Sequence, residues 1–306
     1  FNNLREREKK LQALVDQRTY ELQRANSELE NAVHMIEEKN QKLEIAYKDI
    51  RDSINYARKI QQAILPSIHD VYAALEQSFV FYRPKDIVSG DFYFFAEKNK
   101  KIMIGVADCT GHGVPGAFMS MIGHDMLNQI IIEKGITSPS EVLNQLESGI
   151  RGALKQDLEN AETKDGMDIA LCQLDMHRHK DDTVAVQYAG AFRNLYIVRK
   201  HANEVEEVRA DKISIGGVIL GDVKKFSNHE IHLQKGDSFY IFSDGYCDQF
   251  GGPGGKKFMT RQFQRLLMSI KDHSMKEQEA ILERTFKEWK GDLEQVDDIL
   301  VIGVRV

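Results

Sequence analysis

The stretch "DCTGHGVPGAFMS", Asp108–Ser120, constrains the fold more than any other part of the sequence. It begins with an aspartate, places three glycines and a proline within the next eight residues, and continues as an apolar helical pattern. Because glycine destabilises regular helices and strands, such a run indicates a tightly bent loop. We therefore predict a strand that ends near Asp108, a sharp turn, and a helix that starts directly after the turn.

The segments around this loop predict an α+β fold. Helical patterns at about 116–134, 139–158, 260–270 and 275–290 interrupt groups of antiparallel-looking strands, which favours a layered sandwich over a doubly wound parallel sheet. Alternating apolar segments predict these strands at 79–84, 91–98, 101–108, 168–175, 183–190, 194–200, 237–244 and 298–306.

The first 65 residues contain no glycine and no proline, and Pro66 ends this run. Apolar residues recur there every seven positions, as in a coiled coil. The main register holds Val15, Leu22, Leu29, Ile36, Leu43, Ile50, Ala57 and Ile64. We predict a coiled-coil linker over 1–65 that forms a homodimer, followed by a globular domain over 66–306. The pattern fits a passive stalk and a signal-transmitting helix equally well.

Composition excludes some classes of protein. The net charge of -6 gives no basic surface for nucleic acid, and the three cysteines lie far apart, which indicates a reducing compartment. No uncharged apolar run is long enough to span a membrane, so we expect no membrane contact within this chain. The chain begins with Phe1. We therefore expect a cytoplasmic piece of a longer protein, with a sensor domain upstream that could be attached to a membrane.

Four aspartates lie at predicted strand ends or in glycine-containing turns: Asp91, Asp108, Asp244 and Asp297. Carboxylates that converge without basic partners repel one another, and a hard divalent cation such as Mg²⁺ or Mn²⁺ relieves that repulsion. Taken alone, each of them is more simply an ordinary turn aspartate, since Asp beside Gly is common in turns. Their combination in one chain favours a two-metal site that acts on a phosphoryl group.

Several motifs in this order resemble the metal-dependent PPM protein phosphatases, in the bacterial sporulation-stage-II-E branch. They are "VSGDFY", "DCTGHGVPGAFMS", "GMDIAL", "YAGA", "IGG", "GDSFYIFSDGYCDQFGG" and "DDILVIGV", and together they cover about 79–306. The resemblance implies a sandwich of two antiparallel β-sheets flanked by helices. The long coiled-coil helix would precede this sandwich.

The resemblance also implies a role for each matching residue. Asp108 would bridge two Mn²⁺ or Mg²⁺ ions, with further ligands from the Cys109 carbonyl, Asp244, Asp297 and Asp91. Asp298 would support these ligands. Water activated by the ions would attack a phosphoserine or phosphothreonine, with Asp108 and Asp91 as catalytic residues.

Some positions depart from the family pattern. Arg83 and Lys85 are candidates for binding phosphate, although their spacing differs from that of the eukaryotic arginine. His112 is a candidate proton donor, and a structural hydrogen bond within the turn is the alternative. The chain reads "YAGAFRN" at 188–194, where many relatives have "YAGAHNP".

We therefore predict a metal-dependent serine/threonine phosphatase regulated through a dimeric linker. Its substrate would be a phosphorylated anti-anti-sigma-type protein, as the family analogy suggests. The alternatives are a catalytically silent phosphatase-like binding module, a coiled-coil scaffold, and a two-metal hydrolase of small phosphate esters.

Overall fold

The computed structural model describes residues 2–98, 100–156, 163–175, 183–217 and 225–306. The chain divides into two units, Phe1–Ile54 and Asn55–Val306. Helix α1, Asn2–Ile64, ends one residue before position 65, the predicted end of the linker. The second unit nevertheless begins at Asn55, so it includes the last turns of this helix.

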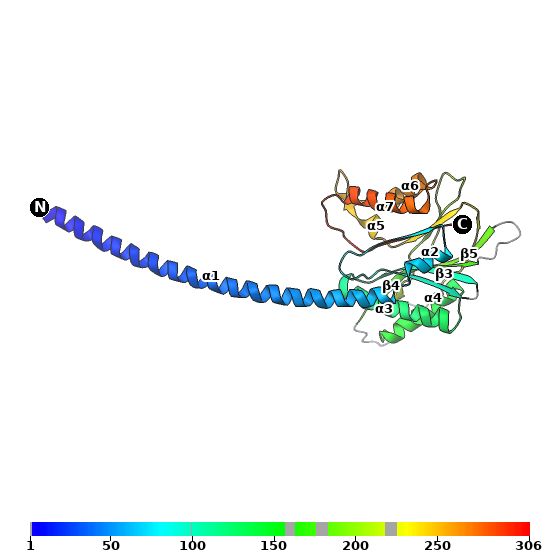
Figure 1. Ribbon diagram of the computed structural model, residues 1–306, viewed down its shortest axis with the longest axis horizontal. Coiled ribbons are helices and arrows are strands. Elements are labelled where there is room, and N and C mark those ends of the chain that lie inside the picture. The colour runs from blue at the N-terminus through cyan, green and yellow to red at the C-terminus, as the bar shows by residue number, and fades with distance from the viewer. Residues whose placement is uncertain (1, 99, 157–162, 176–182, 218–224) are drawn as a thin grey trace. The chain divides into compact units, whose positions relative to one another are not determined.

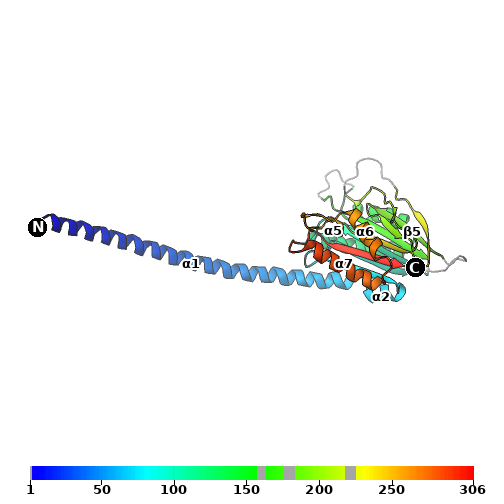
Figure 2. The same cartoon turned by 90° about the horizontal axis from the view of Figure 1, so that it is seen from above.

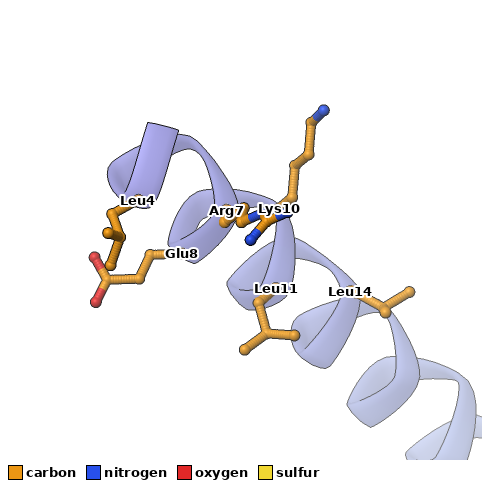
Figure 3. A pocket seen from close by; sticks show the side chains of 6 residues that line it. All are labelled: Leu4, Arg7, Glu8, Lys10, Leu11 and Leu14. Atoms are coloured by element: carbon orange, nitrogen blue, oxygen red, sulfur yellow. The ribbon is translucent and has the colours of Figure 1, made fainter. Parts of the chain in front are cut away.

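Helix α1 carries its apolar stripe on an open surface. Leu4 is 73% exposed and Leu11 is 65% exposed. Figure 3 shows both side chains, with Leu14, standing out from the first turns of the helix. A long helix in water needs a partner for such a stripe, so the predicted dimer has a surface on which it could form. No helix in the described part of the chain combines the length and apolar character that crossing a membrane requires.

Two antiparallel sheets form the middle of the second unit (Figure 1), which confirms the predicted sandwich. The five-stranded sheet has the order β1 (Ser78–Arg83), β13 (Ile299–Arg305), β10 (Ser238–Phe242), β6 (Leu195–Val198) and β7 (Glu206–Val208). The six-stranded sheet has the order β2 (Phe92–Lys98), β3 (Lys101–Cys109), β4 (Gly166–Asp175), β5 (Thr183–Ala191) and β9 (His229–Gln234), with β8 (Ile215–Gly216) beside β4. A separate short hairpin joins β11 (Phe250–Gly251) to β12 (Lys256–Lys257).

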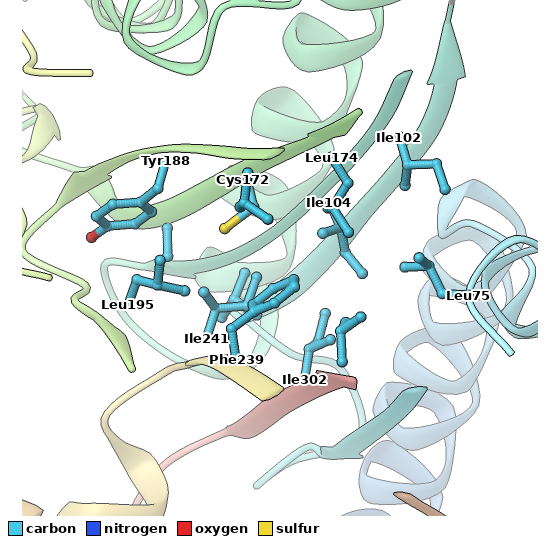
Figure 4. Close-up of a cluster of buried hydrophobic side chains, with 14 of the residues drawn as sticks. Leu75, Ile102, Ile104, Cys172, Leu174, Tyr188, Leu195, Phe239, Ile241 and Ile302 are labelled. Atoms are coloured by element: carbon cyan, nitrogen blue, oxygen red, sulfur yellow. The ribbon is translucent and has the colours of Figure 1, made fainter. Parts of the chain in front are cut away.

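The main core fills the space between the two sheets (Figure 4). Ile104 and Cys172 project from the six-stranded sheet toward Phe239, Ile241 and Ile302 of the five-stranded sheet. All five side chains are almost completely buried. This arrangement explains the alternating pattern, because successive side chains of a strand point to opposite faces of its sheet.

Helices cover the outer face of each sheet. The six-stranded sheet packs against α3 (Gly113–Asn128), the π-helical turn η1 (Gln129–Glu133) and α4 (Pro139–Ala153). The five-stranded sheet packs against α5 (Gly245–Asp248), α6 (Thr260–Ile270) and α7 (Met275–Lys290). Figure 1 shows α6 and α7 on the side of the sandwich away from α3 and α4, and Figure 2 looks onto that side. Helix α2 (Ile68–Ala74) contributes to the central core instead, through Ile68 and Val71.

The predicted helices are all present, and two match their predicted bounds. Helix α7 begins at a capping box in which Ser274 and Glu277 exchange hydrogen bonds, and this local sequence motif determines where the helix starts. Helix α4 ends at Ala153, before the predicted end at 158. Lys155 takes a left-handed φ of 53° there, which stops the helix. Residues 157 and 158 lie outside the described part of the chain.

Candidate active site

Acidic residues from both sheets lie near one end of the sandwich. Asp108 stands directly opposite Asp168 in the antiparallel pairing of β3 with β4. The other members come from strand ends: Asp91 precedes β2, Asp244 follows β10, and Asp297 and Asp298 precede β13. Strand ends hold a carboxylate on rigid backbone, so the sheets rather than the loops determine where most of these groups lie.

The glycine-rich loop is bent because three backbone segments pack tightly together. A Cβ atom on Gly116 would lie 2.8 Å from Gly90 Cα and still closer to the Gly111 carbonyl oxygen. Gly111 itself has a φ of 82°, which side-chain-bearing residues rarely adopt. The glycines therefore bring the start of α3 against the segment that carries Asp91.

One arginine lies among the carboxylates. Arg193 Nη2 is 2.8 Å from Oδ2 of both Asp108 and Asp244, and 3.3 Å from Asp168 Oδ2. The bond to Asp244 has hydrogen-bond geometry. Asp108 Oδ2 accepts no hydrogen bond, although it lies at ion-pair distance, so its contact with Arg193 is electrostatic only. The guanidinium thus offsets the mutual repulsion of three carboxylates.

Asp91 is the most buried acid of the group, at 2% exposure. Burial raises its pKa well above the usual range, and the negative charge of Asp108 raises it further. Its Oδ2 atom is buried and has no hydrogen-bond partner among the described residues. A buried, unpaired carboxylate oxygen is costly, so this atom requires a proton or a cation.

The neighbouring carboxylates are perturbed in the same direction. Burial raises the pKa of Asp108 to about 7, against the opposing effect of Arg193. Burial likewise raises the pKa of Asp168 and of Asp297. A group of carboxylates with raised pKa values binds protons more readily than free aspartate does, and for the same reason it favours other cations.

Asp298 holds the loop that leads to Asp91. Its Oδ1 atom accepts from the Lys85 backbone N–H and its Oδ2 atom accepts from the Gly90 backbone N–H, both at 2.7 Å. Both carboxylate oxygens are therefore engaged within the protein. This geometry suits a residue that positions the site.

His112 lies in an exposed chain of polar contacts beside the glycine loop. Its Nδ1 atom is 2.7 Å from Asp86 Oδ2, and its Nε2 atom is 3.0 Å from Lys85 Nζ. An ammonium group donates, so Nε2 accepts and Nδ1 carries the ring proton toward Asp86. In this tautomer, Nε2 has no proton to give. Sequence analysis did not identify Asp86, the residue that fixes this arrangement.

The sequence predicts Arg83 as a phosphate-binding candidate, and its described side-chain contacts are with residues other than the site carboxylates. Its Nε atom donates to Gln295 Oε1 at 2.9 Å, and its guanidinium lies 5.5 Å from the centre of the Phe286 ring. Cys109 is buried at the end of β3, and burial raises the pKa of its thiol, which keeps the thiol protonated. A nucleophilic role for Cys109 is therefore not supported.

A divalent cation fits the chemistry of these residues. The donors are carboxylate oxygens, which Mg²⁺ and Mn²⁺ prefer, and the unpaired oxygens of Asp91 and Asp108 are suited to accept a cation. Within the described residues, however, no three acidic, histidine or cysteine side chains stand close enough to hold one ion as they are arranged. Arg193 lies between three of them instead.

Sequence analysis missed three residues that the structure places here. Asp168 is part of "GMDIAL". It could have been identified by pairing that predicted strand with the strand that ends at Asp108. Arg193 lies in the departure "YAGAFRN", and its contacts depend on tertiary structure. Gln61 comes from the end of α1 and donates to the Ser89 carbonyl at 2.6 Å and to Ser120 Oγ at 2.9 Å.

The fold is that of PP2C-type phosphatase domains. The SiaA-PP2C domain of Pseudomonas aeruginosa is 34% identical and superimposes with a TM-score of 0.75, covering 85% of this chain and 98% of the other. The phosphatase domain of SpoIIE from Bacillus subtilis, with a fragment of its regulatory domain, has the same fold at 21% identity. Its TM-score is 0.56, over 75% of this chain and 61% of that one.

The chain belongs to the Stage II sporulation protein E (SpoIIE) family, whose profile matches residues 98–306. This is a family of metal-dependent serine/threonine phosphatases, as the motifs predicted. Among curated proteins, the phosphoserine phosphatase RsbU of Bacillus subtilis is 28% identical over 215 residues. That alignment covers 70% of this chain and 59% of RsbU, so the chain spans little more than half of that relative.

Proposed function

We propose that the chain hydrolyses phosphoserine or phosphothreonine on a protein partner with the help of two Mn²⁺ or Mg²⁺ ions. The observation that supports this most directly is the convergence of Asp108, Asp168 and Asp244 on one cation, Arg193. Site residues that gather around a positive charge in this way are suited to bind metal ions. Family membership supplies the reaction class.

In this proposal, Asp108, Asp244, Asp297 and Asp91 hold the ions together with the Cys109 carbonyl. When bound, the ions supply Lewis acids that activate water and offset the charge of the phosphoryl group. The protein orients these ligands through β3, β10 and β13. Asp298 contributes by fixing the loop that leads to Asp91.

His112 serves as proton donor only after a change in its hydrogen bonds. Its Nε2 atom faces the Lys85 ammonium, so Lys85 must move away and the ring must gain a proton before Nε2 can donate. Lys85 would be free to approach the phosphoryl group after that movement.

The proposed substrate is a phosphorylated anti-anti-sigma-type protein in a partner-switching pathway. The support is similarity to RsbU, and the RsbU and RsbW domains of Rv1364c from Mycobacterium tuberculosis share the fold at 19% identity. We further propose that residues 1–65 form a homodimer that regulates the phosphatase, because the apolar stripe of α1 is exposed.

Phosphate release tests the activity. The substrates are a phosphoserine protein and an aryl phosphate, each assayed with Mn²⁺, Mg²⁺ or chelator. We compare wild type with Asp108→Asn, and with Asp272→Asn at an exposed site as the matched control. The proposal expects metal-dependent release that only Asp108→Asn abolishes. Release from the aryl phosphate alone would instead favour a hydrolase of small esters.

A silent binding module is the second candidate, because the described carboxylates are not arranged to hold an ion as they stand. If the folded protein released no phosphate and calorimetry detected no Mn²⁺ binding, the chain would be a silent binding module. Mn²⁺ binding without release would indicate an inhibited enzyme. Fusions that lock 1–65 in different coiled-coil registers then test the linker, and equal activity in all registers would refute its regulatory role.

A further inference from the structure

The backbone around Arg193 is built to direct its side chain into the site. Phe192 has a left-handed φ of 54° although it carries a bulky side chain, and such a conformation costs on the order of 1 kcal/mol. The buried Tyr188 hydroxyl donates to the Arg193 carbonyl. A Cβ atom on Gly190 would lie 2.6 Å from that same carbonyl oxygen, so only glycine permits the contact.

The guanidinium uses only part of its hydrogen-bonding capacity. All three ion pairs are made by Nη2, while Nε is buried and has no hydrogen-bond partner among the described residues. Arginine has five N–H donors in a planar fork, and that fork matches two oxygens of a phosphate. Buried donors normally have a hydrogen-bond partner, so the unpaired Nε indicates that this edge of the guanidinium binds an acceptor that is not part of the described chain.

The charge of the site requires a cation that stays when metal ions bind. Two divalent ions carry four positive charges, against the six carboxylates of Asp91, Asp108, Asp168, Asp244, Asp297 and Asp298. A phosphate dianion would therefore approach a site that is still negative. Among the predicted phosphate-binding residues, Arg83 is engaged with Gln295 and Lys85 with His112.

We propose that Arg193 binds the phosphoryl group in this site. When metal ions bind, Asp108 and Asp244 would coordinate the ions in place of Arg193. Asp168, which accepts a hydrogen bond from Ser214 Oγ at 2.7 Å, would remain paired with the guanidinium and hold it in position. The Nη2 donor that is freed from Asp244, together with Nε, would then bind two oxygens of the phosphoryl group. This inference rests on the proposed function, since it assigns a residue to the same reaction.

Calorimetry tests the assignment without any need for turnover. Inorganic phosphate is titrated into the Mn²⁺-loaded full chain as wild type, Arg193→Gln, Arg193→Lys and the control Arg83→Gln. We expect Arg193→Gln to weaken phosphate binding about 10- to 100-fold, the range for lost charge-assisted hydrogen bonds. Arg193→Lys restores part of this affinity, because it keeps the charge but loses the fork. Arg83→Gln binds phosphate as wild type does.

Mn²⁺ affinity, measured in the same variants, separates this role from a structural one. Arg193→Gln should bind Mn²⁺ as tightly as wild type or more tightly, because a competing cation has been removed. Weaker Mn²⁺ binding, unchanged phosphate binding, or no phosphate binding by wild type would each overturn the assignment. Phosphate binding that depends on Arg193 supports it even where no phosphoprotein is hydrolysed, a result that would count only against the proposed function.

Discussion

The side-chain amide of Gln61 and the backbone of Ser89 hydrogen-bond to each other in both directions. Gln61 Nε2 donates to the Ser89 carbonyl at 2.6 Å, and the Ser89 N–H donates to Gln61 Oε1 at 3.1 Å. Nε2 also donates to Ser120 Oγ of α3 at 2.9 Å. The last turn of α1 is thus joined to the segment that leads to Asp91 and to the helix that follows the glycine loop.

Gln61→Leu should lower the free energy of unfolding by about 1–3 kcal/mol. It leaves the buried Ser89 N–H without its partner, and the Ser89 carbonyl keeps only the 3.4 Å hydrogen bond from Ser120 Oγ. It should also weaken Mn²⁺ binding, since Ser89 stands two residues before Asp91. Denaturant unfolding and calorimetry measure the two effects. The control is Gln62→Leu at the exposed neighbouring position. Equal stability of the two variants would show that the Gln61 contacts contribute nothing.

Gly116→Ala and Gly152→Ala should have opposite effects, although both glycines lie in helices. A methyl group on Gly116 meets the backbone of Gly90 and Gly111, so the loop must shift at a cost of about 2 kcal/mol or more. A methyl group on Gly152 meets nothing within 4 Å and should stabilise α4 by up to about 1 kcal/mol. Thermal unfolding of both variants measures the difference, and a harmless Gly116→Ala would contradict the tight packing of the loop.

The stability of the metal-free protein should depend on the ionisation of Asp108. Its folded pKa of about 7 lies above the unfolded value of about 3.9, so the folded state binds the proton more tightly. This group therefore stabilises the fold at acidic pH, and its contribution is lost as pH rises from about 4 through about 7. The loss is on the order of a few kcal/mol.

Urea unfolding in chelator between pH 5 and pH 8 measures this dependence. Asp108→Asn carries no titrating group, so its stability should fall less over the same range. Parallel profiles for the variant and the wild type would contradict the raised pKa. The comparison needs no turnover, so it remains informative for an inhibited enzyme.

Arg193→Gln should destabilise the metal-free protein more than the Mn²⁺-loaded protein. Without metal, the substitution removes the only cation in contact with Asp108, Asp168 and Asp244 within the described structure, and their repulsion is no longer offset. The increase in Tm on adding Mn²⁺ should therefore be larger in the variant than in wild type. An equal increase would show that the ion pairs contribute little to the metal-free fold.

Local sequence patterns were sufficient for the long helices and for most of the longer strands. The helices over 260–270 and 275–290 match because their apolar periodicity is strong, and the second begins at a capping box. The elements β7, β8, β9, β11, β12, α2 and α5 were not predicted. Most of them contain too few residues to show a period, and β9 has only two buried apolar residues, Ile231 and Leu233, among polar ones.

The residues of the site also fall into two groups, those that local sequence patterns identify and those that only the tertiary structure brings together. The sequence by itself determined which strand ends carry Asp91, Asp108, Asp244 and Asp297, because each follows or precedes an apolar strand with a recognisable motif. Only the tertiary structure decided that Asp168 stands opposite Asp108, and that Arg193 and Gln61 reach the same region. Strand register and helix docking bring together residues far apart in the chain, and a left-handed turn at Phe192 directs Arg193 inward. Such contacts arise from packing across the sandwich, which no local pattern encodes.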